Sequence, residues 1–466
     1  MLRILCYLSI STFFLASCSN SNSGPNSNSN SNAKAPEKES TVSQFERAGY
    51  CDFLIDKSGV YHALFQESPA NGKSIFIYYA SSTDQGATWS KPIALSDDHT
   101  ANGSSYGRIL QDGSGNIYAI WKRFGQGGNQ YPVQEVTLDG PGSYSIGTLY
   151  YKVLNNGNWS DAVQLNEFEA AQQSWFATVT PQGKVQVFWT QFSPQALKAT
   201  QQTMWYYCDY FRMTELNGTN HTAFTDLNSP STLTQGASYP SEQNGAINLD
   251  GYVDNTGTVH LIYEDKPNGI EEIKYFDGKT KRVVYSYPKG LEDNTFNHPA
   301  KLMKDEKGND HLLFLPSPKT LESEQVWDMN LSTNQTNVLV SIQKPTVTIS
   351  GFQANQGPNG SMAITFEAGA YAENTEAYGI FYNNGAWQNV GLTNNASKEK
   401  FFSREFEVLG GYHAILSTIT RYNSTFGAVA WDGAGNKSML MNISAYWSGA
   451  GISTSSPSIV FIPIGK

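Results

Sequence analysis

A short unit built around one glycine recurs along this chain of 466 residues and limits what it can fold into. Each unit is a turn ending in glycine, followed by about six residues of strand character that close on an aromatic or aliphatic residue. Most of the spacings between successive glycines are close to fifty residues, which is the period of a four-stranded propeller blade. The pattern predicts an all-β fold, a single β-propeller of seven blades, with six as the alternative. The glycines are Gly59, Gly115, Gly183, Gly257, Gly308, Gly360 and Gly410.

A second element, a tight turn that ends in tryptophan, follows several of these strands. Residues 82–89 read STDQGATW, and shorter copies read NNGNW at 155–159 and NNGAW at 383–387. The first resembles the Asp box of sialidase-like (BNR-repeat) β-propellers, over about residues 45–466. In such a turn short polar side chains bond the backbone, glycine takes a positive φ and tryptophan packs between sheets. The box is therefore expected to be structural, through Ser82, Asp84, Gly86, Thr88 and Trp89.

The propeller places the chain's loops on two faces. Strands A to D run outward from the axis, so the A–B and C–D turns share one face and the B–C and D–A loops share the other. Long irregular segments such as 123–147 and 190–203 belong to the second face, where propellers usually bind ligands. The last strand, residues 458–464, is expected to dock on the first blade and close the ring.

Four arginines are expected near the loop face. Arg108 opens strand A of blade 2 and Arg123 closes its strand B, while Arg404 and Arg421 are expected at the matching places of blade 7. Glu67 stands at the strand-B end of blade 1, between these two blades. Sialidases hold a substrate carboxylate with clustered guanidinium groups, which bind carboxylates bidentately. The alternative is that these arginines link blades or are scattered over the surface.

The resemblance also implies candidates for catalysis. A sialidase needs a tyrosine nucleophile paired with a glutamate, and an acid on a loop. Asp98, or its neighbour Asp97, is the candidate acid, and Glu264 with a nearby tyrosine is the candidate base and nucleophile. Ulvan-lyase-like propellers resemble the same scaffold and use histidine and tyrosine, for which His99 and His298 are the candidates.

Other features of the sialidase pattern are missing. The F/Y-R-I-P motif has no proper match, because residues 106–110 share only Arg-Ile with it, and one clean Asp box replaces the usual several. Four of the seven histidines repeat at one place, three residues after the glycine, which favours packing or a shared bond between strands, whereas His221, like His99 and His298, is off the pattern. The four are His62, His260, His311 and His413.

The N-terminus predicts export and lipidation. Arg3 precedes an apolar stretch from Ile4 to Ala16 that is too short to span a bilayer. It ends in Leu-Ala-Ser-Cys, which resembles a bacterial lipobox, so residues 1–17 are expected to be a signal peptide and Cys18 the acylated first residue. Residues 18–44 are polar and read as a disordered tether. Because serine follows Cys18, the resemblance implies the outer membrane, with the lipid as the only membrane attachment.

Composition limits the partners. The net charge is −10 without a basic stripe, which disfavours nucleic acid. Charged residues make up 15% of the chain and aromatic residues 13%, a balance that suits stacking on sugars but also the filling of sheets. Cys51 and Cys208 could form a disulfide or remain free thiols.

No cofactor or metal is predicted. Residues 112–116 and 432–436 hint at calcium loops but lack further acidic ligands, so ordinary Asx turns explain them. The favoured function is a surface-anchored glycan-binding or scaffold propeller. The alternatives are a glycosidase or polysaccharide lyase acting on acidic sugars, and a propeller that binds a protein partner.

Overall fold

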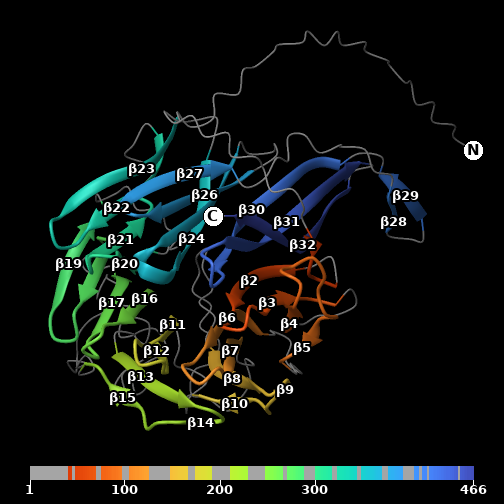
Figure 1. Ribbon diagram of the computed structural model, residues 1–466. Coiled ribbons are helices and arrows are strands. Elements are labelled where there is room, and N and C mark those ends of the chain that lie inside the picture. The colour runs from red at the N-terminus through yellow and green to blue at the C-terminus, as the bar shows by residue number, and fades with distance from the viewer. Residues whose placement is uncertain are drawn as a thin grey trace, which may run out of the picture. The chain divides into compact units, whose positions relative to one another are not determined.

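The computed structural model describes seventeen stretches of the chain: residues 40–44, 48–69, 75–96, 104–124, 147–165, 174–191, 210–228, 247–265, 270–287, 300–316, 323–343, 348–369, 376–391, 404–408, 412–416, 419–449 and 452–465. Within them, seven four-stranded antiparallel blades form a ring, so the chain is a seven-bladed β-propeller (Figure 1). The described residues contain one 3-10 turn, Pro358–Gly360, and no helix that could cross a membrane.

Blades 1 to 3 run from the innermost strand outward in chain order. In blades 2 and 3 one more short strand, β9 or β15, pairs with the third strand. The strands are β2 (Ala48–Ile55), β3 (Tyr61–Glu67), β4 (Phe76–Ser82) and β5 (Ile93–Ala94) in blade 1; β6 (Ser104–Gln111), β7 (Ile117–Phe124), β8 (Gly147–Asn155), β9 (Asn158–Trp159) and β10 (Val163–Gln164) in blade 2; β11 (Trp175–Val179), β12 (Val185–Gln191), β13 (Tyr210–Asn217), β14 (Asn220–His221) and β15 (Thr225–Asp226) in blade 3.

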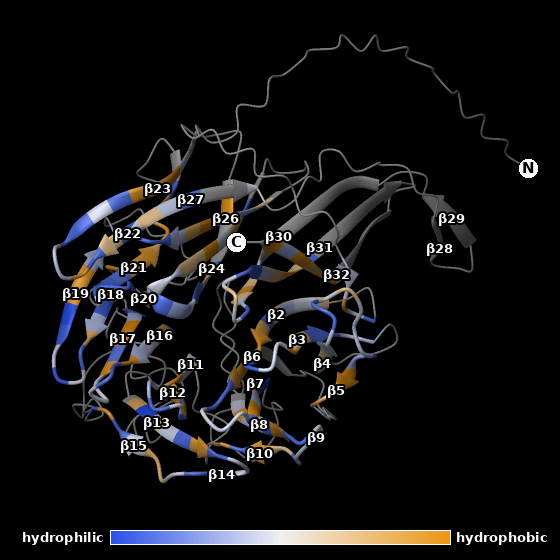
Figure 2. Ribbon diagram, in the orientation of Figure 1, coloured by the Kyte–Doolittle hydropathy of each residue, from blue (hydrophilic) through white to orange (hydrophobic). Residues whose placement is uncertain are grey.

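Blades 4 to 6 repeat the same order with four strands each. The outer strand of blade 4, β19, begins with the exposed residues Lys281 and Arg282, and its lower part is coloured as hydrophilic (Figure 2). The strands are β16 (Ile247–Val253), β17 (Val259–Asp265), β18 (Glu272–Phe276) and β19 (Lys281–Ser286); β20 (Lys301–Lys304), β21 (Asp310–Phe314), β22 (Ser323–Asn330) and β23 (Gln335–Gln343); β24 (Thr348–Gln356), β25 (Met362–Gly369), β26 (Glu376–Asn383) and β27 (Ala386–Gly391).

Blade 7 combines both ends of the described chain. Its inner three strands are β30 (Ile419–Trp431), β31 (Lys437–Gly449) and β32 (Ile452–Gly465), and its outer strand is β1 (Ser40–Thr41). The last strand therefore belongs to blade 7, and the N-terminal strand completes that blade. The sequence left the pairing of the last strand open: β32 pairs with β31 and β1 within blade 7, and its Phe461 packs against Phe53 and Tyr61 of blade 1. The backbone of Val42 and the side chain of Ser43, next to β1, bind the backbone of Ile459 in the same strand. These residues lie in the stretch that the sequence assigns to the tether.

The position predicted for the seventh blade was also wrong. The strands around Gly410 are β28 (Arg404–Val408) and β29 (Tyr412–Leu416), which form a separate two-stranded sheet. Gly410 itself lies outside the described residues. The A–B turn of blade 7 is instead the turn at Gly435, which has a φ of +82°. A glycine-led hairpin has the same local pattern inside or outside a blade, so the sequence could not separate the two.

Asx turns explain why the A–B turns carry aspartate and glycine. Asp56 Oδ1 accepts the backbone N–H groups of Ser58 and Val60 at 2.9 and 2.8 Å, while Gly59 takes a φ of +84°. The same turn recurs at Asp112, Asp254, Asp305 and Asp432. The two segments that hinted at calcium, at 112–116 and 432–436, are thus ordinary Asx turns, as predicted.

The Asp box holds the ring closed. Asp84 accepts the backbone N–H and the hydroxyl of Thr88, and Gly86 donates its N–H to Ser82 Oγ at 2.9 Å. Trp89 Nε1 donates to Ser40 Oγ at 3.2 Å, and Ser40 donates to the Gly86 carbonyl at 2.7 Å. The Asp box of blade 1 is therefore joined by hydrogen bonds to β1, the outer strand of blade 7.

Candidate ligand site in the axial channel

Neighbouring blades are joined near the axis by polar side chains of their innermost strands. Asp52 of β2 accepts the N–H of Ile109 in β6 at 2.9 Å. Asp250 of β16 accepts the N–H of Leu302 in β20 at 3.0 Å. An amide does the same between blades 6 and 7, where Asn355 Oδ1 accepts the N–H of Val429 at 3.0 Å. Each bond satisfies a backbone donor of the next blade that the innermost strand leaves open.

Two of these ties also carry an ion pair. Arg108 Nε lies 3.2 Å from Asp52 Oδ2, and Lys301 Nζ lies 3.6 Å from Asp250 Oδ1. Arg108 directly precedes Ile109, and Lys301 directly precedes Leu302, whose backbone N–H groups the two aspartates accept. Arg108 is therefore a link between blades, one of the two alternatives that the sequence left open for it. Lys301, which sequence reasoning missed, is its counterpart between blades 4 and 5.

An axial cavity of about 600 Å³ lies among the innermost strands of all seven blades. Its lining combines aromatic side chains with groups that can donate or accept hydrogen bonds, as is usual for small-ligand pockets. The aromatic lining residues are Phe53, Phe176, Tyr252 and Trp431, and the charged or amide lining residues are Asp52, Arg108, Asp250, Lys304, Asp305, Asn355 and Gln356.

The charges of this cavity are largely balanced. Arg108 and Asp52 pair across blades 1 and 2, and Asp250 has Lys301 beside it. Lys304 Nζ lies 4.6 Å from the centre of the Tyr252 ring. Burial alone would raise the pKa of Asp305, but hydrogen bonds from Asn309 and from its own turn lower it. Both oxygen atoms of this carboxylate therefore already accept hydrogen bonds. The cavity therefore offers hydrogen-bonding groups without an excess of positive charge.

The four predicted arginines do not occupy equivalent positions. Arg123 lies at the end of β7 with its guanidinium carbon 5.7 Å from the centre of the Tyr150 ring. Arg404 begins β28, outside the blades, and Arg421 belongs to β30, the innermost strand of blade 7. The prediction that Arg404 and Arg421 match Arg108 and Arg123 was wrong, because the seventh blade begins later in the chain. The side chains of Arg404 and Arg421 lie outside the described part of the structure.

Glu67 and Glu264 are buried where blades meet. Glu67 is 0% exposed and accepts the backbone N–H of Gln44 at 3.4 Å. Glu264 is 1% exposed and accepts from Asn248 Nδ2 at 2.7 Å and from the N–H of Ala300 in blade 5 at 3.4 Å. Burial, followed by the charge of Glu271, raises the pKa of Glu264 to about 8. Both carboxyl groups stabilise seams and neither is open to a substrate.

Several other predicted residues lie outside the described residues: Cys18, Asp98, His99, Cys208 and His298. Cys51 is described, and it is a free cysteine whose Sγ lies 3.4 Å from the Leu440 carbonyl. Burial raises the pKa of Cys51 to about 12, so its thiol stays protonated and unreactive. Among the described residues no group of three or more metal-ligating side chains is found.

Three of the repeated histidines form the shared bond between strands that their spacing predicts. Each places Nε2 3.2 to 3.4 Å from the aspartate of its own A–B turn. The other ring nitrogen meets a group of the third strand: His62 meets Tyr79 at 2.8 Å, His260 meets Tyr275 at 2.6 Å and His311 meets Asp328 at 2.7 Å. The side chain of the fourth, His413, lies outside the described part.

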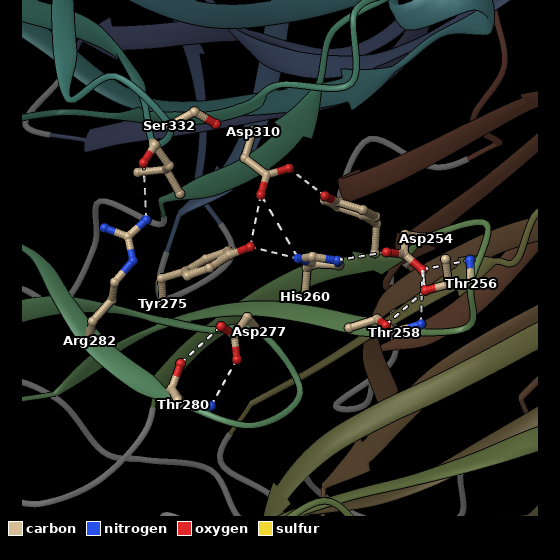
Figure 3. A network of polar contacts seen from close by, with 12 residues as sticks. Asp254, Thr256, Thr258, His260, Tyr275, Asp277, Thr280, Arg282, Asp310 and Ser332 are labelled. Carbon is tan, nitrogen blue, oxygen red and sulfur yellow. Dashed lines mark hydrogen bonds and ion pairs between the residues drawn. The ribbon is translucent and has the colours of Figure 1, made fainter.

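The largest of these networks links blades 4 and 5. Figure 3 shows His260 between Asp254 and Tyr275, with Asp310 of β21 close to both rings. Tyr275 donates to Asp310 Oδ2 at 2.8 Å, and Tyr252, which lines the cavity, donates to the other oxygen of the same carboxylate. The hydroxyl of Tyr252 is thus committed, and its ring stacks on His260 with the ring centres 4.8 Å apart.

A repeat-based signal could have located the axial residues. Asp52 and Asp250 each stand four residues before the aspartate of their own A–B turn, and so do Arg108 and Lys301. Since equivalent positions of neighbouring innermost strands adjoin around the axis, aligning the repeats on the turn would have paired acid with base. The same four residues also stand seven positions before the glycine of their own turn, so the repeat glycines carry this signal too.

The comparisons with known proteins concern the fold alone. No protein-family model matches the chain, and no curated protein matches it. A protein of unknown function from Dyadobacter fermentans has 11% identity and a TM-score of 0.41, over 92% of this chain and 98% of its own. An alpha-L-arabinanase from Penicillium chrysogenum has 12% identity and a TM-score of 0.37, over 92% and 99%. The NanB sialidase from Streptococcus pneumoniae has 14% identity and a TM-score of 0.38, over 93% and 71%.

Proposed function

We propose that this chain is a carbohydrate-binding β-propeller held at the cell envelope by a lipid on Cys18. The observation that carries the proposal is the axial cavity, where aromatic rings and hydrogen-bonding groups line one space of about 600 Å³. Sugar rings stack on aromatic faces, and their hydroxyl groups use donors and acceptors at once. A binding role is favoured over hydrolysis because Glu67 and Glu264 are buried in seams.

Isothermal titration of the purified chain with a panel of oligosaccharides tests the binding role. We expect saturable binding of at least one sugar and its loss in Trp431→Ala, because Trp431 lines the cavity. The matched control is Phe224→Ala, an aromatic residue beside Arg212 and His221 on the outer part of blade 3. Failure of every sugar to bind would refute the proposal. Turnover of a sialoside or a uronic-acid polymer would show instead that the chain is an enzyme.

The proposed lipid attachment to the cell envelope is tested separately. Cells expressing the chain are fed a labelled palmitate, and we expect label on the wild type and none on Cys18→Ala. The Cys18→Ala variant should also leave the membrane fraction, because a lipid is the only membrane attachment that the sequence predicts. Fractionation and protease treatment of intact cells then report which membrane holds the chain and which side it faces. Unlabelled wild type would contradict lipidation.

A further inference from the structure

We infer that the Asp52–Arg108 pair makes the axial cavity selective for uncharged sugars over carboxylated ones. This inference rests on the proposed carbohydrate-binding function and assigns the class of ligand. Arg108 and Asp52 both line the cavity, and Asp52 Oδ2 lies 3.2 Å from Arg108 Nε. The pair thus presents hydrogen-bond donors whose positive charge is already balanced.

The guanidinium has donors to spare. Asp52 is paired with Nε, and the described residues supply no partner for the two terminal nitrogens of Arg108. The side chain is 32% exposed, whereas that of Asp52 is 5% exposed. An arginine has five N–H donors in a fixed fork. Nε is buried and forms no hydrogen bond with a described residue although Asp52 lies 3.2 Å away, so the four donors of the terminal nitrogens are the ones that can meet the oxygen atoms of a ligand. Hydroxyl groups of a sugar are suitable acceptors for them.

The carboxylate of an acidic sugar would gain little binding free energy in this cavity. It would meet Arg108 only together with Asp52, and Asp250 also lines the same space. Its attraction to the guanidinium would be offset by repulsion from Asp52, since Asp250 is already paired with Lys301, and it would still lose its hydration. An uncharged sugar has no such penalty. The cavity therefore discriminates against acidic sugars through Asp52.

The fold itself provides precedents for variants of Asp52 and Arg108 that should keep the structure. Asn355 holds the N–H of Val429 in the way that Asp52 holds the N–H of Ile109, so Asp52→Asn can keep the tie between blades. Lys301 pairs with Asp250 as Arg108 pairs with Asp52, so Arg108→Lys can keep the ion pair. Neither change should unfold the ring, which a thermal unfolding scan of each variant verifies.

The experiment measures binding of sugar pairs with one uncharged and one acidic member: lactose with sialyllactose, which adds a sialic acid, and galactotriose with trigalacturonate, which carries three carboxylates. For wild type we expect the uncharged member of a pair to bind at least about tenfold more tightly. Arg108→Lys should weaken that binding by about tenfold or more, because lysine lacks the fork. Asp52→Asn should reverse the preference, because it leaves the guanidinium unbalanced. The controls are Arg212→Lys and Asp226→Asn, a 2.9 Å pair on the outer strands of blade 3, which should change nothing.

The outcomes separate the two proposals. If neither member of any pair binds, the carbohydrate-binding function fails and the inference falls with it. If sugars bind but wild type prefers the acidic members, or Asp52→Asn keeps the wild-type preference, the function stands and the inference is overturned.

Discussion

At the scale of single residues, glycines of the A–B turns make close contacts between blades. Gly113 donates its N–H to the Gly183 carbonyl at 2.7 Å, which joins the turns of blades 2 and 3. A β-carbon on Gly183 would lie 2.6 Å from the Gly113 α-carbon, and Gly183 also has a φ of +78°. Gly59 has a similar φ of +84° but has nothing within 4 Å of that position. Substituting the two glycines therefore measures the cost of the left-handed backbone conformation separately from the cost of the close contact with Gly113.

Substituting these two glycines tests that separation. Gly59→Ala should cost about 1 kcal/mol of unfolding free energy, because only the left-handed conformation is strained. Gly183→Ala should cost about 3 kcal/mol or more, because backbone atoms must also move apart. Guanidinium denaturation followed by tryptophan fluorescence measures both. Equal losses would mean that the contact with Gly113 contributes nothing.

Glu264 makes stability depend on pH. Its pKa is raised from 4.5 to about 8 in the folded chain, by burial first and by Glu271 second. A raised pKa means that its contribution is fully present below about pH 4.5 and is lost as pH rises through about 8. Glu264→Gln, which stays neutral, should match wild type near the lower limit and exceed it by a few kcal/mol at about pH 9. Denaturant midpoints measured across this range check it, and parallel pH profiles would contradict it.

At the scale of the elements, the sequence predicted most of what the turns and strands do. Six of the seven glycine-led turns, the Asp box and the shared histidine position depend on residues close in the chain, so local patterns predict them. The strand that completes blade 7 could not be found in this way. Ser40 and Thr41 pair with Phe461 and Val460, more than four hundred residues later, and two residues carry no periodic signal.

Truncation tests the role of β1. Removing residues 1–39 leaves β1 in place, whereas removing residues 1–43 also takes away Ser40, buried Val42 and their bonds to β32 and to the Asp box. We expect the longer truncation to lose about 3 kcal/mol or more of stability relative to the shorter one. It should also self-associate, because the edge of β32 becomes available for pairing. Chemical denaturation and size-exclusion chromatography measure the two effects. Equal stability and equal elution of the two truncated chains would show that β1 does not hold the ring closed.

At the scale of the whole molecule, the candidate site exists only when the ring is closed. The cavity is lined by the innermost strands of every blade, and Asp52, Arg108, Asp250 and Asn355 each act across a blade boundary. The fold class followed from the repeat, and the Asp52–Arg108 and Asp250–Lys301 pairs occupy one repeat position, but Asn355 could not be matched with Val429 because the seventh repeat was misplaced. The wrong position of the seventh repeat also misplaced Arg404 and Arg421.

Ligand binding and ring closure should therefore be thermodynamically linked. A sugar that binds only the closed ring stabilises it by about 2.7 kcal/mol at a hundred times its dissociation constant. By reciprocity, the chain without residues 1–43 should bind the sugar more weakly than the chain without residues 1–39, although neither deletion removes a residue that lines the cavity. Titration of both truncated chains with the sugar that wild type prefers measures the difference. Equal affinities, with the longer truncation shown to be less stable, would place the bound sugar on a single blade and not in the axial cavity.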